Sequence, residues 1–385
     1  MSWDSAKLGD LVEVLDTLRK PITKRNRIAG EYPYYGATGI VDWVNDYIFE
    51  EELVLIGEDG AKWESGEKTA FIVKGKYWVN NHAHVVKPDE NKLLNSWLEY
   101  YLYFIDLKPW VTGLTVPKLN QANLKSIPIP IPPLQTQKQI VEKLDAAFAD
   151  IHKAISATEK NIENAEALFQ KSLHSIFFGE TSNNWNKNSL KELSDKITDG
   201  SHNPPKGIEV SNYLMLSARN VFNDRLNFDK VRYLSKMDFN SENKRTNVQE
   251  GDVLLTIVGT IGRSLVFPKT SKNITFQRSV ALIKPKQEII NSHFLKYFFI
   301  SINDFLNKNS RGAAQKGIYL KALSEIEVNH PNYETQNKLV NKFKIIDDQT
   351  NKIIDIYSRK IDELINLKSS ILNQAFSGKL TKDAA

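Results

Sequence analysis

The chain has 385 residues, of which 41% are hydrophobic and 10% aromatic, so it is long enough for two or three domains with substantial cores. It contains no cysteine, which excludes disulfides, thiolate nucleophiles and cysteine-based zinc sites. No apolar run approaches the roughly 18 residues of a membrane-spanning helix. The N-terminus also lacks the basic and apolar regions of a signal peptide. We therefore expect a soluble, cytoplasmic protein.

The net charge of +5 is distributed unevenly along the chain. Residues 1–134 carry 15 basic and 18 acidic side chains, whereas residues 181–333 carry 22 basic and 14 acidic ones. The positive excess of the second segment is compatible with contact to nucleic acid. An ordinary solvated surface explains the totals equally well.

Residues 1–133 are predicted to form a globular unit of mixed α and β structure. Four short runs with turn clusters between them are typical of strands; they lie at 53–57, 70–73, 76–80 and 84–88. An amphipathic helix is predicted at 95–107. The glycine-rich and aromatic segments 32–43 and 110–120 are predicted to be ordered loops.

Residues 134–180 are predicted to form one long helix. Its apolar residues follow one another at steps of three and four over five heptads, which indicates a coiled-coil seam. A pair of prolines precedes the helix, Thr136 and Gln139 have the spacing of a capping box, and Gly179 is the expected stop residue.

The rest of the chain repeats this plan. An offset of 199 pairs Gln137 with Gln336 and Gly179 with Gly378, and no gap is needed between these pairs. Residues 181–332 are therefore predicted to form a second globular unit of the same mixed type. Residues 333–385 are predicted to form a second long helix and a C-terminal tail.

Within the second globular unit, runs at 252–259 and 280–285 stand where strands were predicted in the first unit, and a helix is predicted at 291–306. A lone amphipathic helix of this length would be unstable, whereas two of equal length can pair as an antiparallel coiled coil. The predicted fold class is α+β, with two mixed α/β domains joined by two long helices as a pseudo-twofold internal repeat.

Several motifs of the sequence resemble those of one family, the specificity subunit of type I restriction–modification systems. They are IPIPIPPLQTQKQIVEKLD with its echo IEVNHPNYETQNKLVNKF, TGLTVPKLN, ITDGSHNPPKG, YPYYGATGIVD, DVLLTIVGTIGR and ILNQAFSGKL. The resemblance covers the whole chain in the family's order of recognition domain, helix, recognition domain and helix. The sequence departs from the family at Thr136 and Thr335, where members often carry an acidic residue, and in the eroded second proline motif.

The resemblance implies a subunit without chemistry of its own. Each recognition domain would read one half of a split target in double-stranded DNA, and the helices would set the gap between the halves. Two adenine-methylating modification subunits and, for restriction, the translocating nuclease subunits would be its partners. No cofactor is expected on this chain, whereas S-adenosylmethionine, magnesium and ATP are expected on the partner subunits.

Basic, amide and aromatic side chains on the predicted loops are the candidates for DNA contact, to bases or to phosphates. In the first unit they are Tyr34, Tyr35, Thr38, Lys62, Trp63, Asn81, His82, Thr115 and Lys118. In the second unit they are His202, Asn203, Lys206, Arg219, Asn220, Thr260, Arg263, Gln277, Arg278, Arg311, Gln315 and Lys316.

Two other functions stay open from the residues alone: a self-contained methyltransferase or nuclease, and a coiled-coil adaptor that binds protein. Asn203-Pro204-Pro205 matches the start of an amino-methyltransferase motif, but Lys206 stands where that motif needs an aromatic ring to stack the target base. No glycine-rich turn for S-adenosylmethionine precedes it. We therefore expect neither a catalytic nor a metal site.

Overall fold

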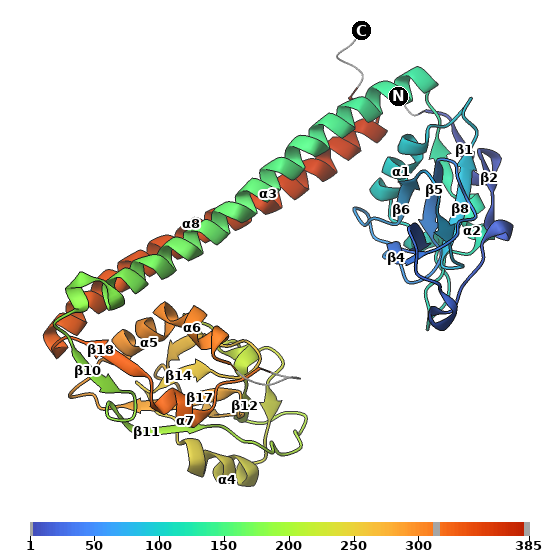
Figure 1. Cartoon of the computed structure of the whole chain (residues 1–385). Coiled ribbons are helices and arrows are strands. Elements are labelled where there is room, and N and C mark those ends of the chain that lie inside the picture. Colours follow the sequence, from blue (N-terminus) through green and yellow to red (C-terminus); the bar gives the residue numbers. More distant parts are fainter. Residues whose placement is uncertain (1–2, 311–315, 381–385) are drawn as a thin grey trace. The chain divides into compact units, whose positions relative to one another are not determined.

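The structure of the chain is a computed structural model that describes residues 3–310 and 316–380. It divides into two compact units. Unit 1 consists of residues 1–159 and 358–385, and unit 2 consists of residues 160–357. Each unit combines a globular part with one half of each long helix, as Figure 1 shows.

The two long helices are α3 (Leu134–Phe178) and α8 (Tyr333–Phe376). In unit 1 the first half of α3 packs its seam residue Leu144 into the same core as Leu372 from the end of α8. In unit 2 the end of α3 packs against the beginning of α8, where the rings of Phe177 and Phe343 stack 5.5 Å apart. The helices therefore run antiparallel in both units, which confirms the predicted pairing.

The helix ends differ from the predicted caps. Because α3 begins at Leu134, directly after the proline pair, Thr136 lies within the first turn and not at the N-cap. Gly378 ends α8 in the left-handed conformation, with φ +74°, as expected of a stop glycine. Gly179 has an ordinary φ of −85°. It is required for space, since a Cβ there would lie 2.2 Å from the carbonyl oxygen of Ser175.

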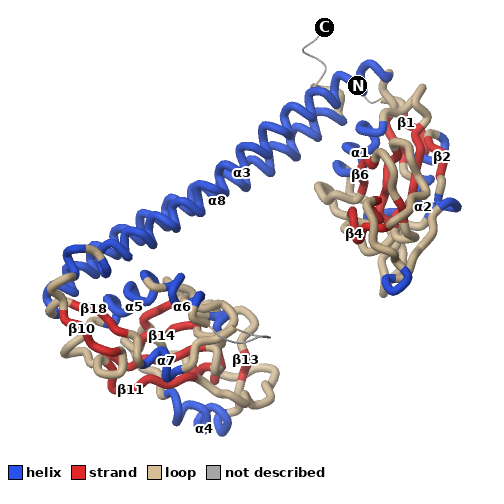
Figure 2. Tube along the Cα trace, viewed as in Figure 1, coloured by secondary structure: helices blue, strands red, loops and turns tan. Residues whose placement is uncertain are grey.

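The globular part of unit 1 contains a four-stranded and a three-stranded sheet (Figures 1 and 2). The antiparallel sheet has the order β2 (Val12–Val14), β8 (Ala83–Pro88), β5 (Leu53–Gly57), β6 (Ala70–Val73). The smaller sheet has the order β4 (Gly39–Val44), β3 (Tyr32–Gly36), β7 (Trp78–Val79), with β3 parallel to β7. The remaining elements are β1 (Ser5–Lys7) paired with β9 (Pro128–Pro130), α1 (Asn95–Phe104), α2 (Gln121–Ser126) and four short 3-10 turns at Leu8–Asp10, Asp16–Leu18, Lys24–Asn26 and Lys108–Trp110.

Strand β5 shows why the sequence of this sheet is continuously apolar. Successive side chains of a strand point to opposite faces, and both faces of β5 are covered. Val54 and Ile56 pack into the core beneath the long helices, whereas Leu53 and Leu55 pack into a second core with Phe71 and the three-stranded sheet. Because neither face of such a strand meets solvent, its sequence does not alternate between apolar and polar residues.

Unit 2 repeats both sheets. The antiparallel sheet has the order β11 (Ser194–Asp199), β17 (Val280–Pro285), β14 (Val253–Thr256), β15 (Ser264–Val266). The smaller sheet has the order β13 (Arg232–Tyr233), β12 (Tyr213–Leu216), β16 (Asn273–Phe276), with β12 parallel to β16. The other elements are β10 (Asn186–Ser189) paired with β18 (Glu327–His330), α4 (Lys236–Thr246), α5 (Ser292–Ser301), α6 (Asn303–Lys308), α7 (Leu320–Ser324) and 3-10 turns at Glu180–Ser182 and Ala218–Asn220. The α+β class and the internal repeat are confirmed.

Two predicted elements need correction, and one helix was not predicted. Residues 32–43 form the hairpin β3–β4 and not a loop, because Gly39 takes a left-handed turn conformation with φ +128° that lets the aromatic run pair with the next strand. The predicted helix 291–306 breaks at Ile302 into α5 and α6. Helix α4 was not predicted, because its sequence carries few apolar residues; of these, Phe239 is buried.

A pair of equivalent glutamines ties each long helix to its globular part. Gln137 is fully buried; its amide donates to the carbonyl oxygens of Lys92 (2.7 Å) and Pro132 (2.9 Å) and accepts from the N–H of Leu94 (3.0 Å). Gln336 is equally buried and makes the same three hydrogen bonds, to Ile289 (3.0 Å), Pro331 (2.9 Å) and Asn291 (2.8 Å). Each glutamine thus satisfies backbone hydrogen-bonding groups in the turn that leads into α1 or α5.

Candidate nucleic-acid interface

In unit 1, the loops that follow β3, β5 and β7 meet at one edge of the two sheets. The N–H of Glu58, just after β5, donates to the carbonyl oxygen of His82 (2.8 Å), and the N–H of Asn80, just after β7, donates to that of Tyr35 (3.0 Å). The backbone of Asp59 forms an isolated β-bridge with the backbone of Lys118, which lies in the loop that precedes α2. We call this set of segments, residues 16–19, 37–38, 58–62, 80–82 and 112–119, the loop edge of unit 1.

Beneath this edge lies a buried network of charges. Arg19 donates to the Glu58 carboxylate (2.6 Å) and lies 3.3 Å from that of Asp16. The ring of His84 is 1% exposed; its Nδ1 lies 2.6 Å from the Asp16 carboxylate, and its Nε2 lies 2.7 Å from the carbonyl oxygen of Leu119. Both ring nitrogens thus face oxygen atoms, which holds the ring within the network at both ends.

The two carboxylates of this network are held ionised. Burial alone would raise the pKa of Asp16, but hydrogen bonding and charge attraction from His84 outweigh it and hold the pKa below its ordinary value. Burial likewise acts to raise the pKa of Glu58, and the hydrogen bonds from Lys118 and Arg19 lower it overall. The network fixes the turn after β2 and the loop before α2 to the strand ends.

The remaining basic side chains of this edge also lie beside carboxylates. The Nζ of Lys118 lies 2.8 Å from Glu58, that of Lys62 lies 3.1 Å from Glu67, and the His82 ring lies 2.5 Å from Asp59. The loop edge of unit 1 is therefore largely neutralised by its own carboxylates.

Unit 2 brings the equivalent loops together in the same way. The N–H of Ile257 donates to the carbonyl oxygen of Ser279 (2.9 Å), and that of Gln277 donates to the carbonyl oxygen of Leu216 (2.8 Å). Val258 bridges to Gly317 as Asp59 bridges to Lys118 in unit 1. The loop edge of unit 2 consists of residues 199–206, 217–220, 257–263, 277–279 and 316–318.

The charges at the loop edge of unit 2 are less neutralised. Asp199 binds His202 (2.7 Å) and Arg245. Arg263 places its guanidinium 4.4 Å from the centre of the Phe222 ring, a cation–π contact. Within the described residues, no ion pair involves Lys206, Arg219, Arg278 or Lys316.

Three predicted contact residues are buried and serve the fold. Tyr34 is 1% exposed, and its hydroxyl accepts from the N–H of Ile22 (2.8 Å). Trp63 is 6% exposed and packs into the core beneath the long helices. Asn220 is 1% exposed and hydrogen-bonds to backbone groups on both sides of a loop. Their burial disagrees with the predicted position on accessible loops, because the sequence of a turn does not show whether an aromatic or amide side chain points inward or outward.

The other predicted residues are partly or fully accessible. Tyr35, Arg263 and Gln277 are half-buried; the exposed ones are Thr38, Lys62, Asn81, His82, Thr115, Lys118, His202, Asn203, Lys206, Arg219, Thr260, Arg278 and Lys316. Arg311 and Gln315 lie outside the described residues. Whether the accessible ones contact DNA stays a prediction. Arg19, Lys230 and Arg232 also lie at or beside the loop edges and were not among the predicted residues, because the sequence does not show which loops meet.

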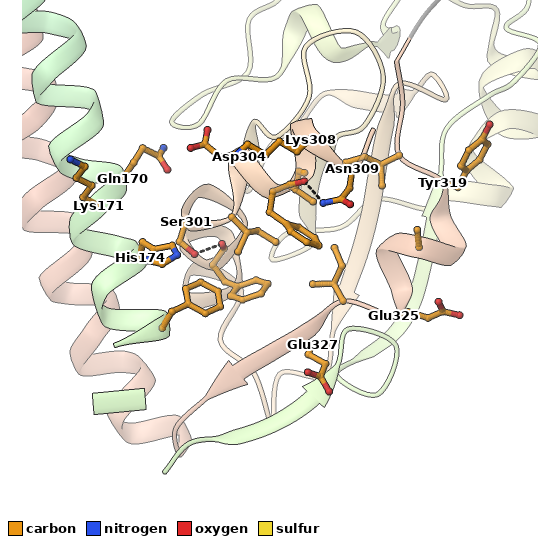
Figure 3. Close-up of a pocket in the computed structure, with 18 residues that line it drawn as sticks. Gln170, Lys171, His174, Ser301, Asp304, Lys308, Asn309, Tyr319, Glu325 and Glu327 are labelled. Carbon is orange, nitrogen blue, oxygen red and sulfur yellow. Dashed lines mark hydrogen bonds between the residues drawn. The ribbon is translucent and has the colours of Figure 1, made fainter. Parts of the chain in front are cut away.

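Unit 2 also contains a hollow of about 900 Å³ between the end of α3 and α6, with a partly apolar lining (Figure 3). Phe178 and Phe305 line it and are 43% and 54% exposed. The hydrogen bonds drawn in Figure 3, from Ser301 and Asn309, go to backbone carbonyls of their own helices. Other polar side chains also line the hollow, among them Lys171, His174 and Asp304.

Neither a metal site nor a membrane segment is present among residues 3–310 and 316–380. No group of three or more histidine, aspartate or glutamate side chains there could hold a metal ion. None of the helices in that part of the chain combines the length and apolar character needed to cross a bilayer.

Comparison with known proteins places the chain in a family. The model of the type I restriction modification DNA specificity domain matches residues 1–161 and 182–364. A putative type I restriction enzyme specificity subunit of Haemophilus influenzae, S.HindORF215P, is 30% identical over 90% of this chain and 88% of its own length. The MjaVIII specificity subunit of Methanocaldococcus jannaschii is 24% identical over 98% of this chain and 93% of its own length.

A solved structure shares the fold. A chain from a study of complex assembly and conformational transition in a type I R-M system superposes with a TM-score of 0.69 at 17% identity, covering 98% of both chains. The two domain matches correspond to the two halves of the internal repeat. This chain therefore belongs to the family of type I restriction–modification DNA specificity proteins.

Proposed function

We propose that this chain reads a DNA target in two parts, each with the loop edge of one unit, as the recognition subunit of a larger complex. The observation that carries the proposal is the duplicated loop edge. In both units the same hydrogen-bond pattern joins the ends of equivalent strands and leaves accessible amide, hydroxyl and basic side chains on the loops. Such side chains are those that read base edges and hold phosphates.

The chain itself is proposed to be non-catalytic. Its partners would be two adenine-methylating modification subunits and, in a restricting complex, translocating nuclease subunits, which would bring S-adenosylmethionine, magnesium and ATP. The segment Asn203-Pro204-Pro205 supports this proposal, because the carbonyls of both prolines accept hydrogen bonds from Arg232 (3.2 and 2.7 Å). The segment is thereby committed to the loop structure of unit 2.

Mapping of methylated adenines tests the function directly. The chain is expressed with its modification subunit in a host that lacks adenine methylation, and methylated positions are read across the genome. A motif of two defined halves separated by unread bases is expected. Methylation that does not depend on this chain, or a single uninterrupted motif, would contradict the proposal.

Two binding measurements separate the rival functions. A protein-binding adaptor predicts no preference among DNA sequences, so the complex is exposed to random duplexes and the bound fraction is sequenced. A self-contained methyltransferase predicts that the isolated chain binds S-adenosylmethionine, which equilibrium dialysis measures. Enrichment of a split sequence together with no cofactor binding by the isolated chain is the expected pair of results.

A further inference from the structure

Unit 2 contains a polar hollow of about 510 Å³ beside its three-stranded sheet. Arg219, Lys230, Arg232 and Gln277 line it, and no aspartate or glutamate is among the described residues that do. We call it the basic pocket. Three cations facing one cavity without a carboxylate repel one another, and an anion in the pocket would relieve that repulsion.

The backbone around the basic pocket is held in place by buried hydrogen bonds. The amide of Asn220 donates to the carbonyl oxygens of Asn227 and Asp229 (both 3.0 Å), and its oxygen accepts from the N–H of Ser217 (3.0 Å). Lys230 follows directly and takes a left-handed conformation, with φ +50°. Residues other than glycine, asparagine and aspartate rarely adopt this conformation, so the loop is held against its own preference.

Three polar side chains of the basic pocket have no partner among the described residues, and a fourth, Arg232, is held in place. Arg232 is tethered to the carbonyl oxygens of Pro204 and Pro205, which fixes the direction of its guanidinium. Within the described residues, the side chains of Arg219, Lys230 and Gln277 take part in no hydrogen bond or ion pair. The pocket therefore offers one oriented guanidinium, further donors without partners and no carboxylate, which are the properties of an anion site.

The shape of the pocket decides which part of DNA it fits. Base edges lie at the bottom of the grooves, where only a protruding side chain, strand or helix reaches them. The phosphate backbone is the convex ridge of the duplex and enters a concave site. We propose that the basic pocket holds a backbone phosphate of the DNA bound by unit 2, with Arg219, Lys230 and Arg232 neutralising it and the Gln277 amide donating to it. This assignment rests on the proposed function.

In unit 1 the corresponding positions are committed to other contacts. Asn80 corresponds to Gln277, since the N–H of Asn80 donates to the carbonyl oxygen of Tyr35 on β3 as that of Gln277 donates to Leu216 on the equivalent strand β12. Asn80 is 6% exposed, and its side-chain oxygen accepts from the N–H of His82 (2.7 Å). On β4, Asp42 pairs with Arg27 (3.0 Å). At these positions unit 1 does not repeat the basic pocket.

The test measures DNA binding by the complex as a function of salt. Lys230→Gln and Arg219→Gln are compared with the unchanged chain on the target duplex and on duplexes altered in either half. Each is expected to weaken binding roughly tenfold on all duplexes alike, and to lower the slope of log affinity against log salt by about 0.9. Lys230→Gly is a second variant that removes the same charge. Because glycine adopts the left-handed conformation without strain, an effect seen in this variant is not due to misfolding of the loop.

The control is Arg225→Gln, which removes the same charge from unit 2 outside the basic pocket and should leave the salt slope unchanged. Binding and slope that match the unchanged chain in both Lys230 variants would overturn the proposal. So would a loss confined to one altered half, since the pocket would then read bases.

Inorganic phosphate is titrated at constant ionic strength without DNA; tight binding that depends on Lys230 would make the pocket a small-anion site instead. If the unchanged complex shows no sequence preference at all, the proposed function fails separately.

Discussion

Replacement of Gln137 by methionine tests how the long helix is joined to unit 1. Methionine has nearly the same length and helix propensity as glutamine, so the change removes polar contacts and little else. Three backbone groups would lose their partners: the carbonyls of Lys92 and Pro132 and the N–H of Leu94. All three bonds lie at a fully buried side chain, at 2.7, 2.9 and 3.0 Å.

The expected loss follows from these contacts. A buried hydrogen bond contributes about 1 kcal/mol net, and a buried group left without a partner costs about 1–3 kcal/mol. Three lost bonds, with partial access of water to the loosened turn, give a destabilisation of about 3 kcal/mol for unit 1. Gln139 is exposed and lies two residues further along the same helix, so Gln139→Met should change the stability by less than about 0.5 kcal/mol.

Tryptophan fluorescence during urea unfolding measures this effect selectively. Of the seven tryptophans, only Trp185 lies in unit 2, so the signal reports almost entirely on unit 1. The midpoint should move strongly for Gln137→Met and little for Gln336→Met, which removes the same three bonds from unit 2. A midpoint for Gln137→Met that coincides with that of Gln139→Met would refute the reasoning.

Three further results are expected. Arg263→Ala, which removes a guanidinium positioned against Phe222, should weaken DNA binding about tenfold or relax the half of the target read by unit 2, and equal affinity across all half-site variants would count against it. Because the folded pKa values of Asp16 and Glu58 lie below their unfolded values, their contribution to stability is complete above about pH 5 and is lost as the pH falls through the folded values. The tryptophan-detected midpoint should therefore drop on acidification, less steeply in Glu58→Gln, and an identical acid profile would contradict this. Gly179→Ala should destabilise unit 2 by about 1–3 kcal/mol, because its Cβ would lie 2.2 Å from the Ser175 carbonyl oxygen, and a thermal melt equal to that of the unchanged chain would contradict this account.

Periodicity and repetition predicted much of the fold. The seam of α3 and α8, the buried strands β5 and β14 and the helix α1 are all apolar patterns that repeat locally, and such patterns depend on few distant contacts. The hairpin β3–β4 was missed because its aromatic residues also suit a loop, and the segment becomes a strand by pairing with β4 and with the distant β7. Helix α4 was missed because its apolar content is low and Phe239 packs on Tyr213 from a distant strand (5.0 Å).

The candidate interface was predicted less completely than the fold, for a physical reason. A loop residue is exposed or buried according to which strand ends meet beside it, and this is a property of the sheet order. Asn220 and Arg219 are neighbours in the sequence, yet one is buried at the centre of a hydrogen-bond cluster and the other lines an open pocket. The same sheet order brings Lys230 and Arg232 beside Arg219, and sequence spacing gives no indication of it.

The two units share one frame and differ at the loop edge, and the frame itself explains how that difference is tolerated. Strand pairing, the buried glutamines and the helix seam hold the frame of both units. Exposed loop residues outside the buried charge network can therefore change charge without a large cost in stability. In unit 1, Lys118 and Arg19 are neutralised by Glu58, whereas the place of Glu58 in unit 2 is taken by Ile257. A cation that already has a carboxylate partner must leave it to neutralise a phosphate and so displaces fewer counterions from DNA. The salt dependence of DNA binding should therefore come mainly from unit 2.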